Sequence, residues 1–473
     1  MLFSSLIFLF IFLPLLIAVY YITPRKFRNY ILLLFSLVFY AWGGVSYVLI
    51  LIGSIVVNFL FVKQLEQNTI NKKKWLVVGL TFNILVIVFF KYLDFLMGNV
   101  NTIGALLFQD YTNFALREIV LPLGISFFTF QQMSLLWDVY RDENLEKATL
   151  SNVALYISLF PQLIAGPIVR YNDIVDQFKT RVESVVLFRS GIQRFLMGLF
   201  KKIVIANSCG EIADSIMLNP VDSINTPIAW LGIIAYTFQI YFDFSGYSDM
   251  AIGLGRIFGF KIFENFNFPY ISQSIQEFWR RWHISLSTWF KDYVYVPLGG
   301  NRDGQYKTYF NLSVVFLLTG IWHGATWSFV LWGLFHGLFL IIEKLGFNKI
   351  LKKLPGILRW AYTITIVMIG WVFFKIDEVP DAIAYVGKLF GAGESNDYHV
   401  LSYLNNESVI ILIIAALFSS TVFKKMKLVL DKFNISKTIV FNVIADLVLL
   451  LTFIYSTMYI NSGSYNPFIY FRF

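Results

Sequence analysis

The chain has 473 residues, of which 57% are hydrophobic, 19% aromatic and only 14% charged. Soluble globular proteins carry about 25% charged residues, so this composition excludes an ordinary soluble globule and indicates an integral membrane protein. The formal charge of +9 comes from lysines and arginines beside apolar stretches, not from one dense basic block. This arrangement favours a membrane protein over a nucleic-acid-binding protein. A single cysteine, Cys209, excludes an intrachain disulfide and any multi-cysteine metal site.

The apolar segments begin at the first residue. Met1 to Tyr21 lacks a basic start and is about 20 residues long, so it predicts a membrane span and not a signal peptide. Further apolar runs follow at 30–62, 75–93, 118–137, 152–169, 186–206, 226–242, 311–342, 357–375, 407–423 and 438–460. We therefore expect an all-α, polytopic membrane protein with about ten to twelve transmembrane helices or half-helices. Glycines 253, 255 and 259 do not fit a dinucleotide fingerprint and predict close helix packing.

The distribution of lysine and arginine predicts the topology. Connections rich in these residues are predicted to be cytoplasmic, and they lie at 25–28, 63–74, 344–359 and 424–437. Three long connections contain almost none and are predicted to face outward: 92–116, 205–225 and 376–406. This threading places both the N-terminus and the tail 461–473 outside.

Two apolar segments, 152–169 and 311–342, fit this threading only if each enters and leaves the membrane on the same face. The second is interrupted at Gly320 and Gly324 after about 12 apolar residues, which rise about 18 Å, short of the roughly 30 Å hydrocarbon core. Non-helical backbone at membrane depth is tolerated only inside protein or beside a wet cavity. We therefore predict re-entrant half-helices and a solvated cavity near Gly320 to Gly324.

The histidines are the first candidates for chemistry. His323 lies on the predicted break, and an ionisable side chain at membrane depth is a functional candidate. The alternative is a neutral imidazole bonded to a neighbouring helix carbonyl. Trp322 and Trp327 are predicted to wall a ligand pocket beside His323. His336, in the middle of an apolar helix and next to a glycine, is predicted to serve packing.

The segment Gln276 to Arg302 carries a stripe of aromatic and apolar residues at helical spacing: Trp279, Trp282, Leu286 and Trp289. This spacing predicts an amphipathic helix near the membrane interface. One interpretation is an interfacial anchor. The other is that Arg280, Arg281 and Arg302 bind an anionic donor such as a coenzyme, with His283 at the mouth of its pocket. The predicted donor-binding residues also include Asn301, Trp322 and Trp327. The histidine spacing disfavours a metal site, and none is predicted.

A series of motifs, in order along nearly the whole chain, resembles the membrane-bound O-acyltransferase family, in its alginate and cell-wall polysaccharide O-acetyltransferase branch. The motifs lie at 126–130, 138–141, 165–170, 241–250, 265–270, 278–287, 297–302 and 322–324. The resemblance implies a ring of membrane helices around a thin central tunnel. It also implies that His323 is the catalytic base and that His283 is the second family histidine.

The same resemblance implies the reaction. An acetyl group would move from a cytoplasmic thioester, either acetyl-CoA or an acyl carrier, across the bacterial cell membrane to an exported polysaccharide such as alginate or peptidoglycan. An exported SGNH-type acetyltransferase would be the partner, and no permanently bound cofactor or nucleic acid is implied. A teichoic acid D-alanyl transferase fed by a carrier protein is the alternative enzyme. The non-enzymatic alternative is a polytopic transporter for lipids or glycan precursors.

The whole chain is expected to form a single membrane domain. Its predicted parts are the N-terminal helices at 1–116, a catalytic core at 117–345 with the interfacial segment 265–302, C-terminal helices at 346–460, and an exoplasmic aromatic tail at 461–473. The composition of the tail predicts an anchor at the membrane interface. Against this, the tail resembles a family terminus whose tyrosine is proposed to carry the acyl group. The resemblance therefore implies a catalytic role for Tyr470, with Phe468 and Phe473 holding the tail in the outward funnel.

Overall fold

The computed structural model describes residues 1–68, 70–108, 112–117, 119–142, 145–393, 399–463 and 465–469. These residues form helices and no strand, which confirms the all-α prediction. The first part of the chain contains α1 (Leu13–Ile22), α2 (Arg28–Ala41), α3 (Val45–Gln67), α4 (Lys72–Ile87), α5 (Leu93–Leu107), α6 (Ile125–Arg141), α7 (Leu150–Ser158), α8 (Phe160–Leu163), α9 (Tyr171–Ile174) and α10 (Gln177–Thr180).

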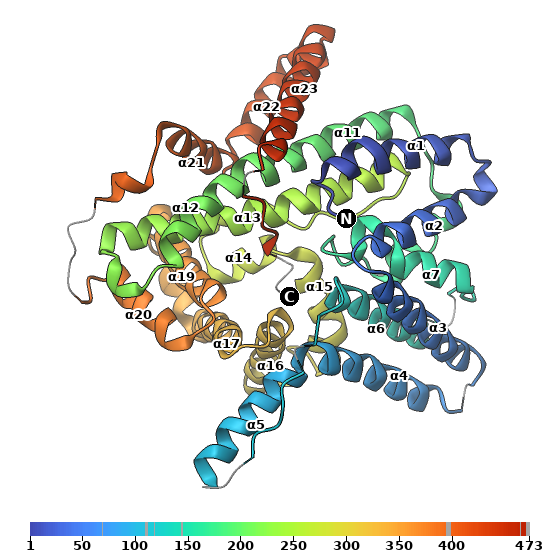
Figure 1. Cartoon of the computed structure of the whole chain (residues 1–473), viewed down its shortest axis with the longest axis horizontal. Helices are drawn as coiled ribbons and strands as arrows, with labels where there is room; N and C mark the ends of the chain where they lie inside the picture. The colour runs from blue at the N-terminus through green and yellow to red at the C-terminus, as the bar shows by residue number, and fades with distance from the viewer. Residues whose placement is uncertain are drawn as a thin grey trace.

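The middle part contains α11 (Val185–Phe200), α12 (Asn207–Met217), α13 (Thr226–Ile257), α14 (Ile275–Arg281), α15 (Ile284–Phe290), α16 (Gln305–His323) and α17 (Trp327–Ile342). The last part contains α18 (Asn348–Leu351), α19 (Gly356–Lys375), α20 (Val379–Leu389), α21 (Asn406–Phe418), α22 (Val422–Lys432) and α23 (Ile439–Asn461). Short π-helical turns join some of them, notably η3 (Val88–Tyr92) between α4 and α5 and η4 (Lys201–Ala206) between α11 and α12. The helices form a ring from which α5 and the pair α22 and α23 project (Figure 1).

Within the described residues, five helices are long and apolar enough to cross a membrane: Val45–Gln67, Lys72–Leu107, Trp327–Leu351, Gly356–Lys375 and Ile439–Asn461. The pair α21 and α22, bent by 62°, adds a sixth crossing if it counts as one span. The other predicted crossings correspond to helices that are shorter or more polar. A helix inside a ring of helices can carry polar side chains because it is shielded from lipid.

The long helix α13 is the centre of the fold. Most of its 32 residues are buried, and it packs along both α11 and α12. The approach to α11 is so close that a Cβ atom on Gly191 would lie 2.7 Å from the carbonyl oxygen of Gly253. No side chain fits there, so Gly253 serves close helix packing, as predicted.

The N-terminus differs from the expected span. The first apolar helix runs from Phe8 to Ile22, and the residues before it fold into the core, where Phe3 is fully buried. Ser5 explains the late start, because its hydroxyl accepts a hydrogen bond from the Phe8 N–H at 3.3 Å, as a helix cap does. Apolar composition from Met1 to Tyr21 therefore overestimates the length of the first helix.

The predicted break in segment 311–342 is present. Helix α16 ends at His323, and α17 begins at Trp327. However, α16 has 19 residues, more than the expected stretch, because it begins in the polar sequence at Gln305. Gly320 is not part of the break. It lies inside α16 against Phe329 and Gly333 of α17, where no Cβ atom would fit.

Candidate active site

His323 is the last residue of α16 and is 2% exposed. Its ring lies 4.8 Å from the Trp322 ring, 5.0 Å from Trp332 and 5.1 Å from Phe374, measured between centroids. The helix stops there because Gly324 adopts an extended conformation. The predicted base is thus held at a helix end inside an aromatic enclosure.

Two residues of the α4–α5 helix bind the end of α16. The Lys91 ammonium donates to the carbonyl of Trp322 at 2.5 Å and to that of His323 at 3.3 Å, and the Tyr92 hydroxyl donates to the carbonyl of Ile321. The last carbonyls of a helix have no partner within the helix and carry partial negative charge, so a cation stabilises them. Lys91 was not among the predicted site residues. A lysine inside an apolar run was the signal that could have found it.

His283 separates two short helices, α14 and α15, where a single amphipathic helix was predicted. Its backbone is left-handed, with φ at 43°, which is uncommon for a residue with a side chain. Asn265 holds the turn, because its carbonyl accepts from the Ile284 N–H at 2.9 Å and its side-chain oxygen accepts from the Ser285 N–H at 3.1 Å. The break therefore depends on a distant loop, which the local spacing does not reveal.

The interpretation of this segment as an interfacial anchor is wrong for its apolar stripe. The stripe packs inside the protein, and the exposed fraction is at most 8% for all four members: Trp279, Trp282, Leu286 and Trp289. The Trp289 ring stacks on Phe130 of α6 at 3.9 Å, and its N–H donates to the Phe130 carbonyl. A period of 3.6 residues identifies a buried face but not what covers it.

The structure brings His283 and His323 together through one tryptophan. The His283 ring lies 6.1 Å from the Trp322 ring, which lies 4.8 Å from His323. On its other side, His283 contacts Phe244 of α13 at 4.6 Å. Residues that are 40 positions apart in sequence thus share one aromatic cluster.

A cavity of about 710 Å³ leads towards this cluster. Basic side chains line it, namely Arg280, Lys291, Lys344, Lys349 and Lys352, and most of them lie in or beside the connection after α17 that is predicted to be cytoplasmic. Other parts of the wall are Trp279, Phe316 and Thr319. Thr319 precedes His323 by four residues in α16, which is about one helical turn. The cavity therefore reaches to within about one turn of the predicted base.

The predicted donor-binding residues do not all reach this cavity. Arg280 lines it. The Arg281 guanidinium instead forms an ion pair with Glu277 at 2.9 Å. Asn301 and Arg302 are exposed and are not among the lining residues. The structure therefore groups Arg280 with lysines of a connection that was predicted to be cytoplasmic but was not predicted to bind the donor.

Trp322 and Trp327 line a second cavity of about 590 Å³, between the α4–α5 helix, α6 and α16. Trp327 is 55% exposed and donates its ring N–H to Asn99 at 3.0 Å. Gly324 also lines this cavity. A cavity at the predicted break is therefore present, and its walls are almost entirely apolar, whereas the basic cavity reaches Thr319, next to Gly320.

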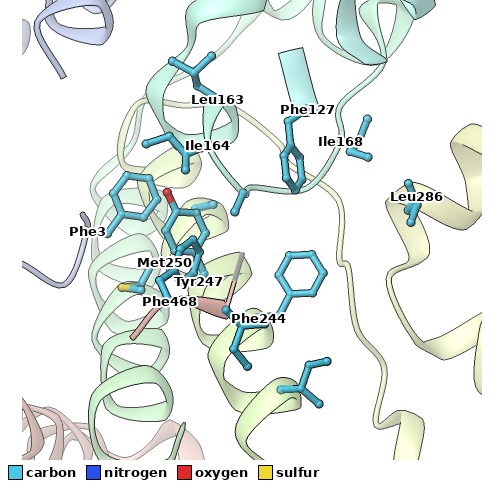
Figure 2. Packing of buried hydrophobic residues seen from close by; sticks show 14 of the residues in the cluster. Phe3, Phe127, Leu163, Ile164, Ile168, Phe244, Tyr247, Met250, Leu286 and Phe468 are labelled. Atoms are coloured by element: carbon cyan, nitrogen blue, oxygen red, sulfur yellow. The ribbon is translucent and has the colours of Figure 1, made fainter. Parts of the chain in front are cut away.

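The described part of the C-terminal tail packs into the core. Phe468 and Ile469 are buried, and the Phe468 ring lies 4.8 Å from the Tyr247 ring of α13. Figure 2 shows Phe3, Tyr247 and Phe468 gathered beside this helix. The Ile469 N–H donates to the carboxylate of Asp243 at 2.9 Å. An anchor at the membrane interface is thus wrong for these residues, whereas Tyr470 and Phe473 lie outside the described residues.

One turn of α13 connects the tail with the histidines. Asp243 and Tyr247 contact the tail, and Phe244, between them, contacts His283. The end of the described tail and the histidine cluster therefore contact the same helical turn. In Figure 1 the tail turns inward from α23 to the middle of the ring.

His336 has different surroundings. It is fully buried in the middle of α17, among the rings of Trp279 at 5.2 Å and Trp332 at 5.3 Å. Gly370 of α19 lies so close that a Cβ atom there would be 2.5 Å from the imidazole Nε2. This tight enclosure supports the prediction that His336 serves packing. Among the described residues, no group of three or more His, Cys, Asp or Glu side chains is placed to hold a metal ion.

Comparison with known proteins gives the family. Residues 84–374 match the model of the membrane-bound O-acyltransferase family. The chain is similar to a probable alginate O-acetylase of Azotobacter vinelandii, with 43% identity over 88% of this chain and 83% of the relative. It is also similar to a peptidoglycan O-acetyltransferase of Helicobacter pylori, with 38% identity over 83% and 80%.

A third relative is a teichoic acid D-alanyltransferase of Bacillus subtilis, which is 33% identical over 53% of this chain and 66% of the relative. The family match includes the break at His323, the turn at His283 and all of α13, so it covers the histidine cluster that the structure assembles. The apolar helices and the family match show that the chain is a multi-pass membrane protein. The chain therefore belongs to the membrane-bound O-acyltransferase family and is an O-acyltransferase.

Proposed function

We propose that this protein moves an acetyl group from a cytoplasmic thioester to an exported polysaccharide of the alginate or peptidoglycan type. The similarity to relatives with these acceptors in their names extends over more than four fifths of the chain. The observation that carries the proposal is the basic cavity that ends about one helical turn from His323. A coenzyme or a carrier phosphopantetheine brings phosphates to such a mouth and a thioester on a long arm, and lysine and arginine are suited to bind the phosphates.

The proposed chemistry uses His323 as a general base. The imidazole takes the proton from the accepting hydroxyl as its oxygen attacks the thioester carbonyl carbon. The C–O bond forms, the C–S bond breaks, and the thiolate leaves with the proton returned by the imidazole. Base catalysis supplies about 10²- to 10⁴-fold. Trp322, Trp332 and Phe374 around the ring keep water away from the thioester.

The accepting hydroxyl in this proposal is that of Tyr470, which then passes the acetyl group to an exported SGNH-type partner or to the glycan. The support is the placement of Ile469, which is bonded to Tyr470 and is fixed on Asp243 beside the histidine cluster. Tyr470→Phe tests the relay, because it removes only the hydroxyl. We expect loss of glycan acetylation at a normal protein level. Normal acetylation in this variant would require direct transfer to the partner.

The orientation is also proposed. The basic cavity mouth lies at the connection 343–359, which the distribution of lysine and arginine places in the cytoplasm, and α23 then delivers the tail to the outside. Cysteine substitutions at positions 70 and 462 test this arrangement in a Cys209→Ser background. Membrane-impermeant reagents added to intact cells should label only position 462.

The decisive experiment measures the release of free thiol by the purified full chain. We expect release from acetyl-CoA or an acetylated carrier when the polysaccharide and the exported partner are added, and none from a D-alanylated carrier. Release only with the D-alanylated carrier would make the protein a D-alanyl transferase. If no donor releases thiol and the protein instead moves a glycan precursor across the membrane of vesicles, the transporter would be favoured.

The donor site has its own test. Arg280, Lys349 and Lys352 line the cavity, so their replacement by alanine should raise the KM for the donor more than it lowers kcat. Arg302→Ala is the matched control, because Arg302 is exposed and does not line the cavity. An unchanged donor KM in the triple variant would contradict this assignment.

A further inference from the structure

A buried ion pair lies against the tail. Lys202 of η4 and Asp243 of α13 are joined by 2.5 Å between Nζ and Oδ1, and both side chains are only 2% exposed. Removing two opposite charges from water is costly, and such pairs do not by themselves indicate stability. Close glycine packing already holds α11, α12 and α13 together. The buried ion pair therefore needs another explanation.

Both members of the pair bind the backbone of the tail. The Lys202 ammonium donates to the carbonyl of Pro467, and Asp243 accepts from the N–H of Ile469 through its second oxygen, at 2.9 Å. The tail is not part of a regular helix here, so the Pro467 carbonyl and the Ile469 N–H need partners from elsewhere. The ion pair supplies both partners, on either side of Phe468. Phe468 itself packs on Tyr247, one turn after Asp243.

Polar contacts extend to the start of the described tail. The Tyr465 hydroxyl donates to the carboxylate of Asp214, which is also paired with Lys375 of α19. Asn207 donates to the side-chain oxygen of Asn466 at 3.2 Å. Side chains of α12, α13 and η4 therefore hold every residue from Tyr465 to Ile469 by a polar bond or by aromatic packing.

We propose that Lys202 and Asp243 are positioning residues that dock the C-terminal tail in the core of the ring, with Asp214 and Tyr465 as the second attachment. The consequence for catalysis rests on the proposed function, since docking Ile469 limits how far the hydroxyl of Tyr470 can be from the histidine cluster. The docking itself is independent of that role. It predicts that the tail is released when the pair is removed, even though the remainder of the helices stay packed.

The chain offers a matched control next to this pair. Lys201, also in η4, is paired with Asp249, also in α13, at 2.7 Å, and the two side chains are only 16% and 7% exposed. Among the described residues, neither Lys201 nor Asp249 forms a hydrogen bond or an ion pair with the tail. Comparing the two pairs therefore separates a loss of tail contacts from a general loss of a buried charge pair between the same elements.

The experiment is hydrogen exchange, followed by mass spectrometry, on the full chain in detergent. The double variant Lys202→Gln with Asp243→Asn avoids leaving one buried charge alone, and Lys201→Gln with Asp249→Asn is the control. We expect the amides of 465, 466, 468 and 469 to lose protection by about tenfold or more in the first double variant only. Saturated acetyl transfer should fall with it, whereas the donor KM should not change because the donor cavity is untouched.

A second variant reaches the tail without changing a charge. A Cβ atom on Gly210 would lie 2.7 Å from the ring of Tyr465, so Gly210→Val should displace that ring and loosen 465–469. Unchanged protection of the tail in both the Lys202/Asp243 and Gly210 variants would overturn the proposal, and so would equal loss in the control pair. Lost protection with normal acetylation would confirm the docking and overturn the relay through Tyr470.

Discussion

His323 and His336 flank the same tryptophan but occupy different kinds of position. Their rings lie 5.0 Å and 5.3 Å from the Trp332 ring, and both are buried. His323 ends a helix, where Lys91 binds its own carbonyl and Trp322 connects it with His283. His336 sits in mid-helix against a glycine and aromatic rings.

Burial and residue type therefore do not distinguish the two histidines. The backbone does so, because a helix end leaves carbonyls and space that a continuous helix fills. In mid-helix the backbone groups are paired within the helix, and the His336 side chain packs among aromatic rings. Each of the following variants tests one part of this difference.

The largest effect is expected at His323. His323→Gln removes the base while keeping a polar side chain, so turnover should fall by about 10²- to 10⁴-fold. His336→Gln should keep most of the activity and lower the thermal stability instead, because it disturbs only packing. Transfer assays and melting curves on both purified variants measure this contrast. Equal losses of turnover in the two variants would contradict the assignment of His323 to the reaction and of His336 to packing.

His283→Ala should come next. The substitution removes a ring between Phe244 and Trp322, so the histidine cluster loses one side. We expect turnover to fall by about 10- to 100-fold, which corresponds to roughly 1.4 to 3 kcal/mol of transition-state stabilisation. A fall in stability without a fall in turnover at low temperature would make His283 a packing residue like His336.

Lys91→Met should have a smaller effect on turnover. It keeps the length of the side chain but removes the charge and the hydrogen bonds to Trp322 and His323. A cation at a helix C-terminus contributes about 0.3 to 2 kcal/mol, so turnover should fall by up to about 30-fold as His323 loses its fixed position. Lys72→Met, in the first turn of the same long helix, is the control and should leave turnover unchanged.

The smallest effect on activity is expected at Gly370. Gly370→Ala pushes a methyl group against His336, and overpacking of this kind costs about 1 to 3 kcal/mol of stability. The melting temperature should fall while turnover per folded molecule stays the same. If turnover fell as steeply as in Lys91→Met, His336 would belong to the reaction and not to packing.

Some features of the fold could be predicted from composition alone. A low charged fraction predicts membrane helices, because charges are costly in hydrocarbon, and glycine at the α11–α13 contact predicts close packing. The break after His323 was also predictable from Gly324, although α16 is longer than the apolar stretch on which the prediction relied. The prediction failed where local spacing was read without its surroundings, as for the single helix across His283.

The sequence by itself therefore determined the class of protein, the break that exposes the end of α16, and His323 as the candidate base. These depend on local composition and helix length, which neighbours in the chain decide. Only the tertiary structure decided that Asn265 bends the chain at His283, that Lys91 binds the end of α16, and that Lys202 and Asp243 hold the tail. Each of these contacts joins residues far apart in sequence, and their energy depends on burial and distance, which no local pattern specifies.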